Sequence, residues 1–163
     1  MNKYDELRKR QQAEFDALPI GAAFGHQQFV EMMKKWDLCH GKDGEPTEND
    51  CKQISHIYAG AYIQKKDVPA LREVSARHKA EFEKAIAEDE TGEGFVYDMF
   101  YSELCNHEYG YTGDPEDAIE ALGMSFEEIY SNEKLSHALE KAERDIMHWE
   151  EEQEAKEEEE ENV

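Results

Sequence analysis

Residues 95–108 read FVYDMFYSELCNHE, and this stretch decides the fold class. Its larger side chains recur every three or four residues, which is the period of one face of an α-helix. The side chains on this face are Val96, Met99, Phe100, Leu104 and His107. The stretch therefore predicts an amphipathic helix that packs one face against a core.

The chain on both sides of this stretch repeats the helical spacing between turn-forming residues. The predicted helices lie over residues 3–18, 26–38, 69–91, 95–108, 115–122 and 132–149, with a short helical turn from Ser125 to Glu128. Three residues have the character of helix caps: Asp114, Ser125 and Asn132. Gly123 is expected to end the helix that Asp114 begins.

Residues 53–58 and 61–64 flank Ala59-Gly60, and this pattern predicts a short β-hairpin. The segments 39–50 and 109–113 carry turn-forming residues and are predicted to be loops. The expected fold is mainly α (α+β), with about six helices and one short β-hairpin packed on them.

The length of 163 residues suits one domain, and the 39% of hydrophobic residues suffices for a modest core. The helical spacing of apolar residues ends at Trp149, beyond which the chain is rich in glutamate. We expect residues 1–149 to form a single globular domain, and residues 150–163 to form a Glu-rich tail that is disordered or a frayed helix.

The net charge of −22 is unevenly distributed along the chain. Residues 1–84 hold 14 acidic and 14 basic side chains, whereas residues 85–133 hold 14 carboxylates and no Lys or Arg. Residues 150–161 add nine glutamates and one lysine. Ordinary protein surfaces mix both signs, so a stretch of this length without a cation suggests a role beyond solubility.

The same charge argues against direct binding to nucleic acid or to an anionic membrane, because both require a cationic surface. No apolar run is long enough for a membrane span, and the charged N-terminus does not resemble a signal peptide. The three cysteines, Cys39, Cys51 and Cys105, form no disulfide pattern, so we expect a reduced, cytoplasmic protein.

Tyrosines and carboxylates without lysine suit contact with Arg and Lys of a partner protein, through cation–π contacts and ion pairs. The alternative is that the tyrosines are half-buried core residues and the carboxylates are merely solvated. The candidate partner-binding residues are Asp98, Tyr101, Glu103, Glu108, Tyr111, Asp114, Glu116, Asp117 and Glu120.

Other patterns permit chemistry without a specific motif. Glu103, His107, Glu108 and Asp114 could form a metal or acid–base site, although His107 could equally be a capping or partly buried residue. Cys105 as a nucleophile lacks a basic residue nearby in sequence. We therefore expect no catalytic residue and no cofactor, and an enzyme is the less favoured class.

Two further metal patterns depart from known spacings. Cys39, His40, Cys51 and His56 are not spaced as zinc knuckles. The segment 89–94 resembles the start of a calcium loop, but the position of the required bidentate glutamate is occupied by Phe100. Loop residues and a glycine junction between helices are the simpler interpretations.

The stretches FVEMMKKW at residues 29–36 and ELCNHEYGYTGDPEDAIEALG at residues 103–123 carry a family resemblance. They resemble a group of small, acidic, uncharacterised proteins of gut Firmicutes, their phages and integrated mobile elements, and the resemblance covers most of residues 1–148. It implies a bacterial cytosol and a mobile-element genome. It carries over no activity and no catalytic residue.

The leading hypothesis is a non-enzymatic interaction protein whose acidic stretch binds the basic nucleic-acid groove of a partner, as a DNA mimic or anti-defence inhibitor. In a mobile element, the targets would be host restriction or CRISPR machinery, or the element's own DNA-processing proteins. The alternative is a small metal-dependent enzyme or metal-binding regulator centred on His107. A third hypothesis is an accessory module that dimerises through its last helix, and the sequence leaves the oligomeric state open.

Overall fold

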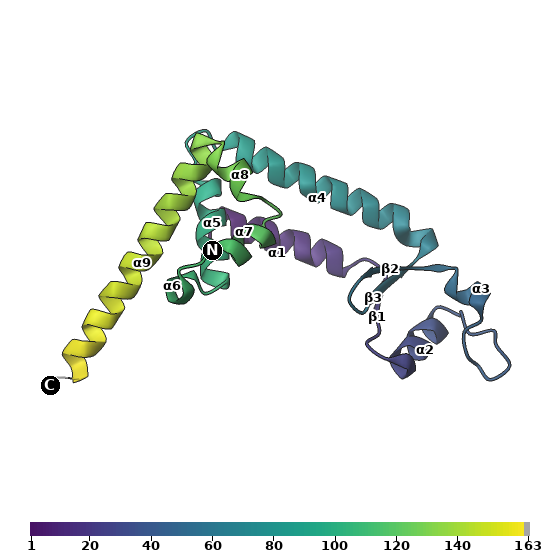
Figure 1. The fold of residues 1–163 in the computed structure, drawn as a ribbon. Helices are drawn as coiled ribbons and strands as arrows, with labels where there is room; N and C mark the ends of the chain where they lie inside the picture. Colours follow the sequence, from purple (N-terminus) through teal and green to yellow (C-terminus); the bar gives the residue numbers. More distant parts are fainter. Residues whose placement is uncertain (162–163) are drawn as a thin grey trace. The chain divides into compact units, whose positions relative to one another are not determined.

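The computed structural model describes residues 1–161, with all side chains except those at 154 and 157–161 (Figure 1). The described helices are α1 (Lys3–Asp16), α2 (His26–Lys35), α3 (Glu48–Cys51), α4 (Val68–Glu88), α5 (Phe95–Asn106), α6 (Tyr109–Thr112), α7 (Glu116–Ala121), α8 (Phe126–Tyr130) and α9 (Glu133–Glu161). The strands are β1 (Ile20–Ala22), β2 (Ile54–Tyr58) and β3 (Ala61–Gln64), and a 3-10 helix, η1, covers Lys65–Asp67. The predicted mainly α (α+β) class is confirmed.

The predicted caps of α8 and α9 form as hydrogen bonds, and at α7 the predicted cap Asp114 lies one residue before the N-cap, Pro115, but still bonds the first helical N–H. Asp114 Oδ1 accepts the Glu116 N–H at 3.0 Å, and the Asn132 side chain accepts the Leu135 N–H at 3.3 Å. At α8, the Ser125 hydroxyl accepts the Glu128 N–H at 3.2 Å, and the Glu128 carboxylate accepts the Ser125 N–H at 2.8 Å. These bonds satisfy backbone groups that the helix itself leaves unpaired.

The predicted hairpin is confirmed as β2 and β3, but it belongs to a larger sheet. The strand order is β1-β3-β2, and both pairs are antiparallel. The strand β1 was not predicted, and its Ile20 pairs with Ile63 at the centre of the sheet. A third strand gives the hairpin the support that two strands lack in water.

The helical content exceeds the prediction in three places. The loop predicted over 39–50 ends in α3, where Thr47 caps the helix, and the loop predicted over 109–113 contains α6. The last helix extends beyond Trp149 to Glu161, and a helix over the tail is one of the two alternatives that the sequence left open. Of the predicted Glu-rich tail, residues 162 and 163 lie outside the described residues.

The chain divides into two compact units. Unit 1 comprises Met1–Lys9 and Glu81–Val163, and unit 2 comprises Arg10–Ala80. This division refines the predicted domain over 1–149, and whether the two units fold as a single domain stays a prediction. No described helix has both the length and the apolar character needed to cross a membrane.

The core of unit 1 forms where α5 packs against α9. Phe100 and Leu104 of α5 and Leu139 of α9 are almost completely buried, so the quoted stretch has the role predicted for it. Ile129 of α8 and Tyr4 of α1 complete this core. Burial of such side chains contributes about 1.5–3 kcal/mol each, which makes this the main stabilising contact of the unit.

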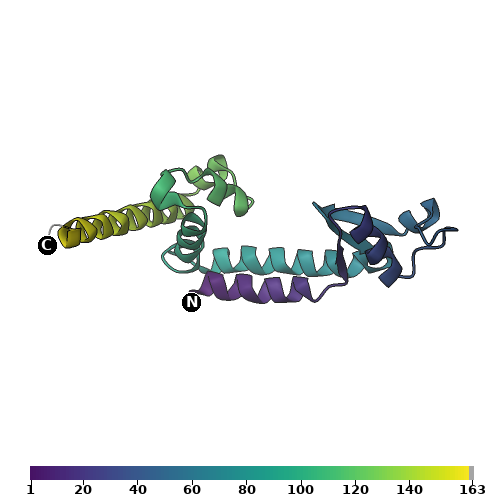
Figure 2. The same ribbon diagram turned by 90° about the horizontal axis from the view of Figure 1, so that it is seen from below.

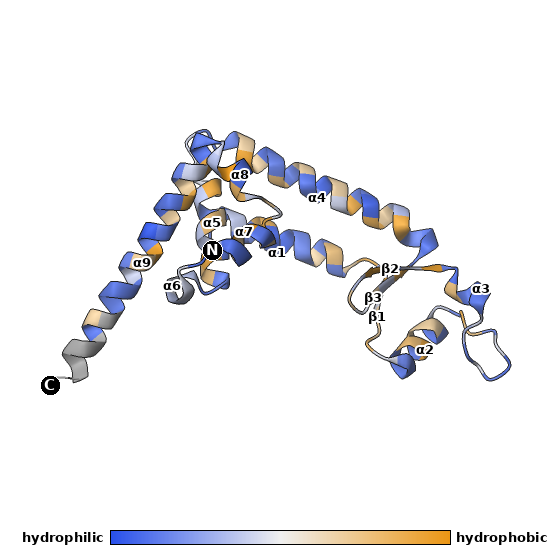
Figure 3. Ribbon diagram, in the orientation of Figure 1, coloured by the Kyte–Doolittle hydropathy of each residue, from blue (hydrophilic) through white to orange (hydrophobic). Residues whose placement is uncertain are grey.

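The core of unit 2 is smaller and is built from α2 and the sheet. Met32 and Met33 of α2 are buried in this core, and Trp36 and Tyr62 pack beside them. The part of α1 in this unit lies beside the part of α4 in this unit (Figure 2). Along α4, apolar residues alternate with hydrophilic ones, the pattern of an amphipathic helix (Figure 3).

Candidate functional site

The net charge of the protein resides entirely in unit 1. Unit 2 carries ten acidic and ten basic side chains, whereas unit 1 carries thirty acidic and eight basic side chains. The difference in unit 1 accounts for the full net charge of −22. The uneven charge of the sequence is therefore also a division between two parts of the fold.

Six of the predicted partner-binding residues are exposed to solvent in unit 1. They are Glu108, Tyr111, Asp114, Glu116, Asp117 and Glu120, which lie on α6, on α7 and in the turns before them. Tyr111 is 92% exposed. Glu108 has a left-handed backbone with φ of 57°, and this turn separates α6 from α5. Most of the predicted partner-binding residues thus belong to one short segment, Glu108 to Glu120, and the structure shows that their side chains are exposed there.

Glu103 has a different position from the others, because it lies in the core of unit 1. It is only 8% exposed, and the hydroxyl of Tyr4, itself 2% exposed, donates a hydrogen bond to its carboxylate. His107 Nε2 lies 3.5 Å from the other carboxylate oxygen. Burial and the hydrogen bond to Glu103 raise the pKa of Tyr4 above its ordinary value. Glu103 is therefore a buried carboxylate, unlike the six exposed residues, and its predicted role in partner binding stays a prediction.

Asp98 is half-buried near the start of α5, where its carboxylate accepts the backbone N–H of Lys3 at 3.3 Å. Partial burial raises the pKa of this carboxyl, and the charge of the nearby Asp5 adds to the effect. Asp98 is thus less available to a partner than the carboxylates of α7.

Tyr101, Glu108 and Tyr111 meet at a cavity of about 650 Å3 between α5, α6 and α9. Trp149 and Glu150 of α9 and Cys105 of α5 also line it. Trp149 was predicted to continue the apolar core face of the last helix, but it is 54% exposed. The sequence analysis therefore did not identify Trp149 and Glu150 as site residues.

Cys105 is exposed but lacks the lowered pKa of a reactive thiol. Partial burial raises its pKa, and the carboxylate of Glu150 adds to the shift, whereas a nucleophilic cysteine needs a lowered pKa. The hydrogen bond with Tyr101 opposes this shift without reversing it.

The candidate metal ligands do not converge. Glu103 and His107 form the pair described above, but no group of three or more His, Cys, Asp or Glu side chains within residues 1–161 is arranged to hold a metal ion. In unit 2, His40 is instead paired with Asp50, with 2.6 Å between Nδ1 and Oδ1. His56 lies against the ring of Tyr62 at 5.1 Å between ring centroids.

The segment 89–94, which resembles a calcium loop, forms a backbone cap. The Asp89 carboxylate accepts the N–H groups of Gly92, Gly94 and Val96 at 2.9–3.1 Å. Partial burial opposes its ionisation, but these N–H groups outweigh that effect and lower its pKa. Its oxygens thus hold the junction between α4 and α5, as the simpler interpretation predicted.

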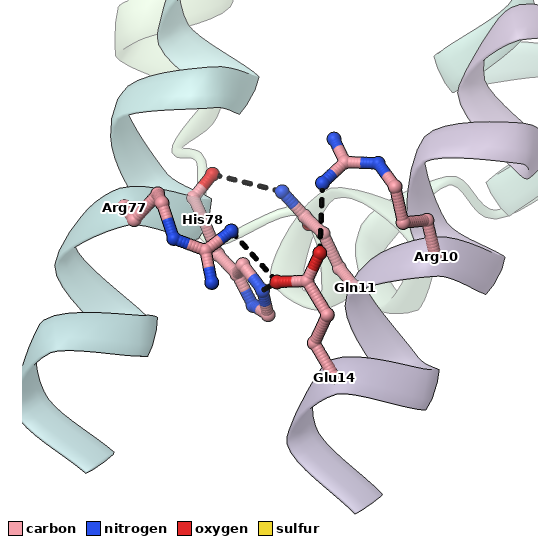
Figure 4. A network of polar contacts seen from close by, with 5 residues as sticks. All are labelled: Arg10, Gln11, Glu14, Arg77 and His78. Atoms are coloured by element: carbon pink, nitrogen blue, oxygen red, sulfur yellow. Dashed lines mark hydrogen bonds and ion pairs between the residues drawn. The ribbon is translucent and has the colours of Figure 1, made fainter. Parts of the chain in front are cut away.

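Unit 2 contains a polar network that the sequence did not indicate, and it joins α1 to α4 (Figure 4). Glu14 lies 2.9 Å from His78 Nε2 and 2.7 Å from an Arg77 guanidinium nitrogen, and Arg10 contacts its other oxygen at 3.0 Å. These contacts, led by the one with His78, lower the pKa of Glu14 to about 2. The carboxylate of Glu14 lies beside the guanidinium groups of both Arg10 and Arg77, so these contacts hold α1 against α4 within unit 2.

Residues 3–145 match the profile of a family described as "Family of unknown function (DUF7659)". The chain belongs to DUF7659. The match spans both units and ends within α9, so Trp149 and Glu150 lie beyond the DUF7659 match. No curated protein and no solved structure matches the chain. DUF7659 membership agrees with the expected uncharacterised family, whereas the origin in gut Firmicutes and mobile elements stays a prediction.

Proposed function

We propose that this protein is a non-enzymatic acidic interaction protein of a phage or mobile element. It binds the basic nucleic-acid groove of a partner protein in the bacterial cytoplasm, as a DNA mimic or anti-defence inhibitor of the anti-CRISPR or anti-restriction type. The single observation that carries the proposal is the confinement of the net charge of −22 to unit 1. A charge that served only solubility would be shared between both units.

The exposed carboxylates of unit 1 support this function by their chemistry. Arginine side chains that hold a phosphate hold a carboxylate in the same way, through two parallel N–H···O bonds. Asp114, Glu116, Asp117 and Glu120 are exposed within seven consecutive residues, with no Lys or Arg among them. Such a segment offers negative charge at close spacing, as a nucleic-acid backbone does.

The electrostatic origin of the binding determines its rate and its salt dependence. Opposite net charges accelerate the encounter of two proteins, and added salt screens the attraction beyond about 8–10 Å. We therefore expect fast association at low salt and a steep loss of affinity as the salt concentration rises.

A displacement assay tests the proposal. Heparin-binding proteins from a bacterial lysate are loaded on immobilised duplex DNA, and the purified protein is added at low salt. We expect it to release at least one DNA-binding protein, because both compete for the same basic groove. A variant with Asp114→Asn, Glu116→Gln, Asp117→Asn and Glu120→Gln should release much less, and Asn at position 114 retains the ability to cap α7.

The matched control neutralises four exposed carboxylates of unit 2: Glu31→Gln, Asp37→Asn, Asp43→Asn and Glu73→Gln. It changes the total charge by the same amount and should release as much protein as the wild type. The proposal is wrong if the wild-type protein releases nothing at low salt, or if the two variants behave alike.

A further inference from the structure

The cavity between α5, α6 and α9 combines aromatic and acidic side chains. Three aromatic side chains, Tyr101, Tyr111 and Trp149, line it together with the carboxylates of Glu108 and Glu150. Most small-molecule pockets are lined by apolar and aromatic side chains with few charges, and this one adds two carboxylates to such a lining. Its chemistry therefore restricts the ligands that it can bind.

The described lining of the cavity supplies no positive charge to pair with these carboxylates. No Lys, Arg or His is among the described residues that line the cavity. Lys141 on α9 does not line the cavity; it lies 3.5 Å from Glu93 and 5.2 Å from the centre of the Tyr97 ring. Within residues 1–161, neither Glu108 nor Glu150 makes an ion pair through its carboxylate.

We propose that this cavity binds one arginine side chain of a basic partner protein. This inference rests on the proposed function and adds to it the place where the partner is anchored. A guanidinium group stacks on aromatic faces, and Trp is the best ring for such a contact. The same planar group can form two parallel hydrogen bonds to one carboxylate, which Glu108 or Glu150 can accept.

Other occupants fit the cavity less well. An apolar ligand would remove two carboxylates from water without giving them a partner, which is costly. A second copy of this chain would bring another strongly acidic unit against the first, so like charges would oppose its binding. A lysine ammonium provides the charge but not the planar stacking surface, so it should bind in the same place with lower affinity.

The fluorescence of Trp149 provides a direct test of binding. Trp36→Phe removes the other tryptophan, which lies in unit 2, so that the remaining emission reports on the cavity. The probes are end-blocked Gly-Arg-Gly, Gly-Lys-Gly and Gly-citrulline-Gly, titrated at low salt. Citrulline matches the shape of arginine without its charge. We expect a saturable change with arginine, several-fold weaker binding of lysine, and no saturation with citrulline.

Two variants and one control connect the signal to the cavity. Glu108→Gln and Tyr111→Ala should each lower the affinity for the arginine probe by about fivefold, the loss expected for one ion pair or one cation–π contact. Tyr111 is almost fully exposed, so its removal does not endanger the fold. Glu127→Gln makes the same charge change on α8, away from the cavity lining, and should keep the affinity within about twofold.

The inference is overturned if citrulline binds as tightly as arginine, if no probe saturates, or if Glu127→Gln acts as strongly as Glu108→Gln. Its failure is distinguishable from failure of the proposed function. If the probes do not bind while the displacement of DNA-bound proteins persists, only the arginine site is wrong. If the arginine probe binds and no displacement occurs, the site stands and the proposed groove-binding function is wrong.

Discussion

Replacing Tyr4 with Phe removes a single oxygen atom from the core of unit 1 and leaves the buried carboxylate of Glu103 without its hydroxyl donor. Tyr4 is 2% exposed and Glu103 is 8% exposed, so water cannot readily replace the lost hydrogen bond. The ring contacts with Phe95 and Phe82, at 5.8 and 6.4 Å between centroids, do not depend on the hydroxyl. Any change in stability therefore reports on the hydrogen bond alone.

The magnitude follows from the partner being a carboxylate. A hydrogen bond to a charged group contributes about 1.5–3 kcal/mol to stability, so Tyr4→Phe should lower the free energy of unfolding by that amount. Urea unfolding at neutral pH, followed by far-UV circular dichroism, measures the change. Tyr111→Phe, which alters an exposed hydroxyl, should change the free energy by less than about 0.5 kcal/mol.

Two further measurements sharpen the test. Adding Glu103→Leu to Tyr4→Phe should recover part of the lost stability, because the buried carboxylate is then gone. The pKa of Tyr4 is raised in the folded protein, so its contribution is complete below the ordinary tyrosine pKa of 10 and is lost at higher pH. Tyr4→Phe should therefore reduce the alkaline loss of stability. A loss below about 0.5 kcal/mol at neutral pH would refute the reasoning.

Three other perturbations have defined outcomes. The pKa of Glu14 is lowered from 4.5 to about 2, so the stability that its carboxylate contributes is complete above pH 4.5 and is lost as the pH falls towards 2. In Glu14→Gln, the free energy of unfolding, measured by circular dichroism, should therefore depend less on pH over this range. Gly92→Ala should cost about 1–3 kcal/mol in thermal unfolding, because φ is +78° and a Cβ would approach Lys134 Cγ to 2.9 Å. Gly113→Ala, with φ of +65° and open space around it, is the control and should cost less. Asp89→Ala should lower the free energy of unfolding by about 0.5–2 kcal/mol in urea, and Asp89→Asn by less, because the amide oxygen can still accept some of the same N–H groups.

The helices of this protein could be predicted because their apolar faces are marked in the sequence. The face that includes Phe100 and Leu104 is buried, and the cap at Ser125 forms as its spacing indicates. The hairpin was predictable from residues 53–64, because a turn separates two runs of strand-forming residues.

The missing elements are those that a short stretch of sequence cannot specify. The strand β1 has only three residues, too few to show alternation, and its place depends on pairing with β3, about forty residues later. The helix α3 had a local signal, since Thr47 and Asp50 form a capping box within the segment predicted to be a loop.

The candidate site was predicted in composition but not in geometry. Glu103 was predicted to be a partner-binding residue, and the sequence did not indicate that Tyr4, from the opposite end of the chain, lies against it in the core. Trp149 continues the helical spacing of Ile146, yet only Ile146 is buried. The helical period predicts that Trp149 lies on the same face of α9 as Ile146. It does not predict how far along α9 the neighbouring helices cover that face.

The separation of charge between the units has a consequence for their stability. Repulsion among the carboxylates of unit 1 lowers the stability of that unit. Unit 2 has equal numbers of acidic and basic side chains and therefore lacks this net repulsion. Salt, or a bound cationic protein, should relieve that repulsion and raise the melting temperature of unit 1 while leaving unit 2 almost unchanged. The partner of such a protein would therefore act as a stabilising counter-ion for one half of the chain.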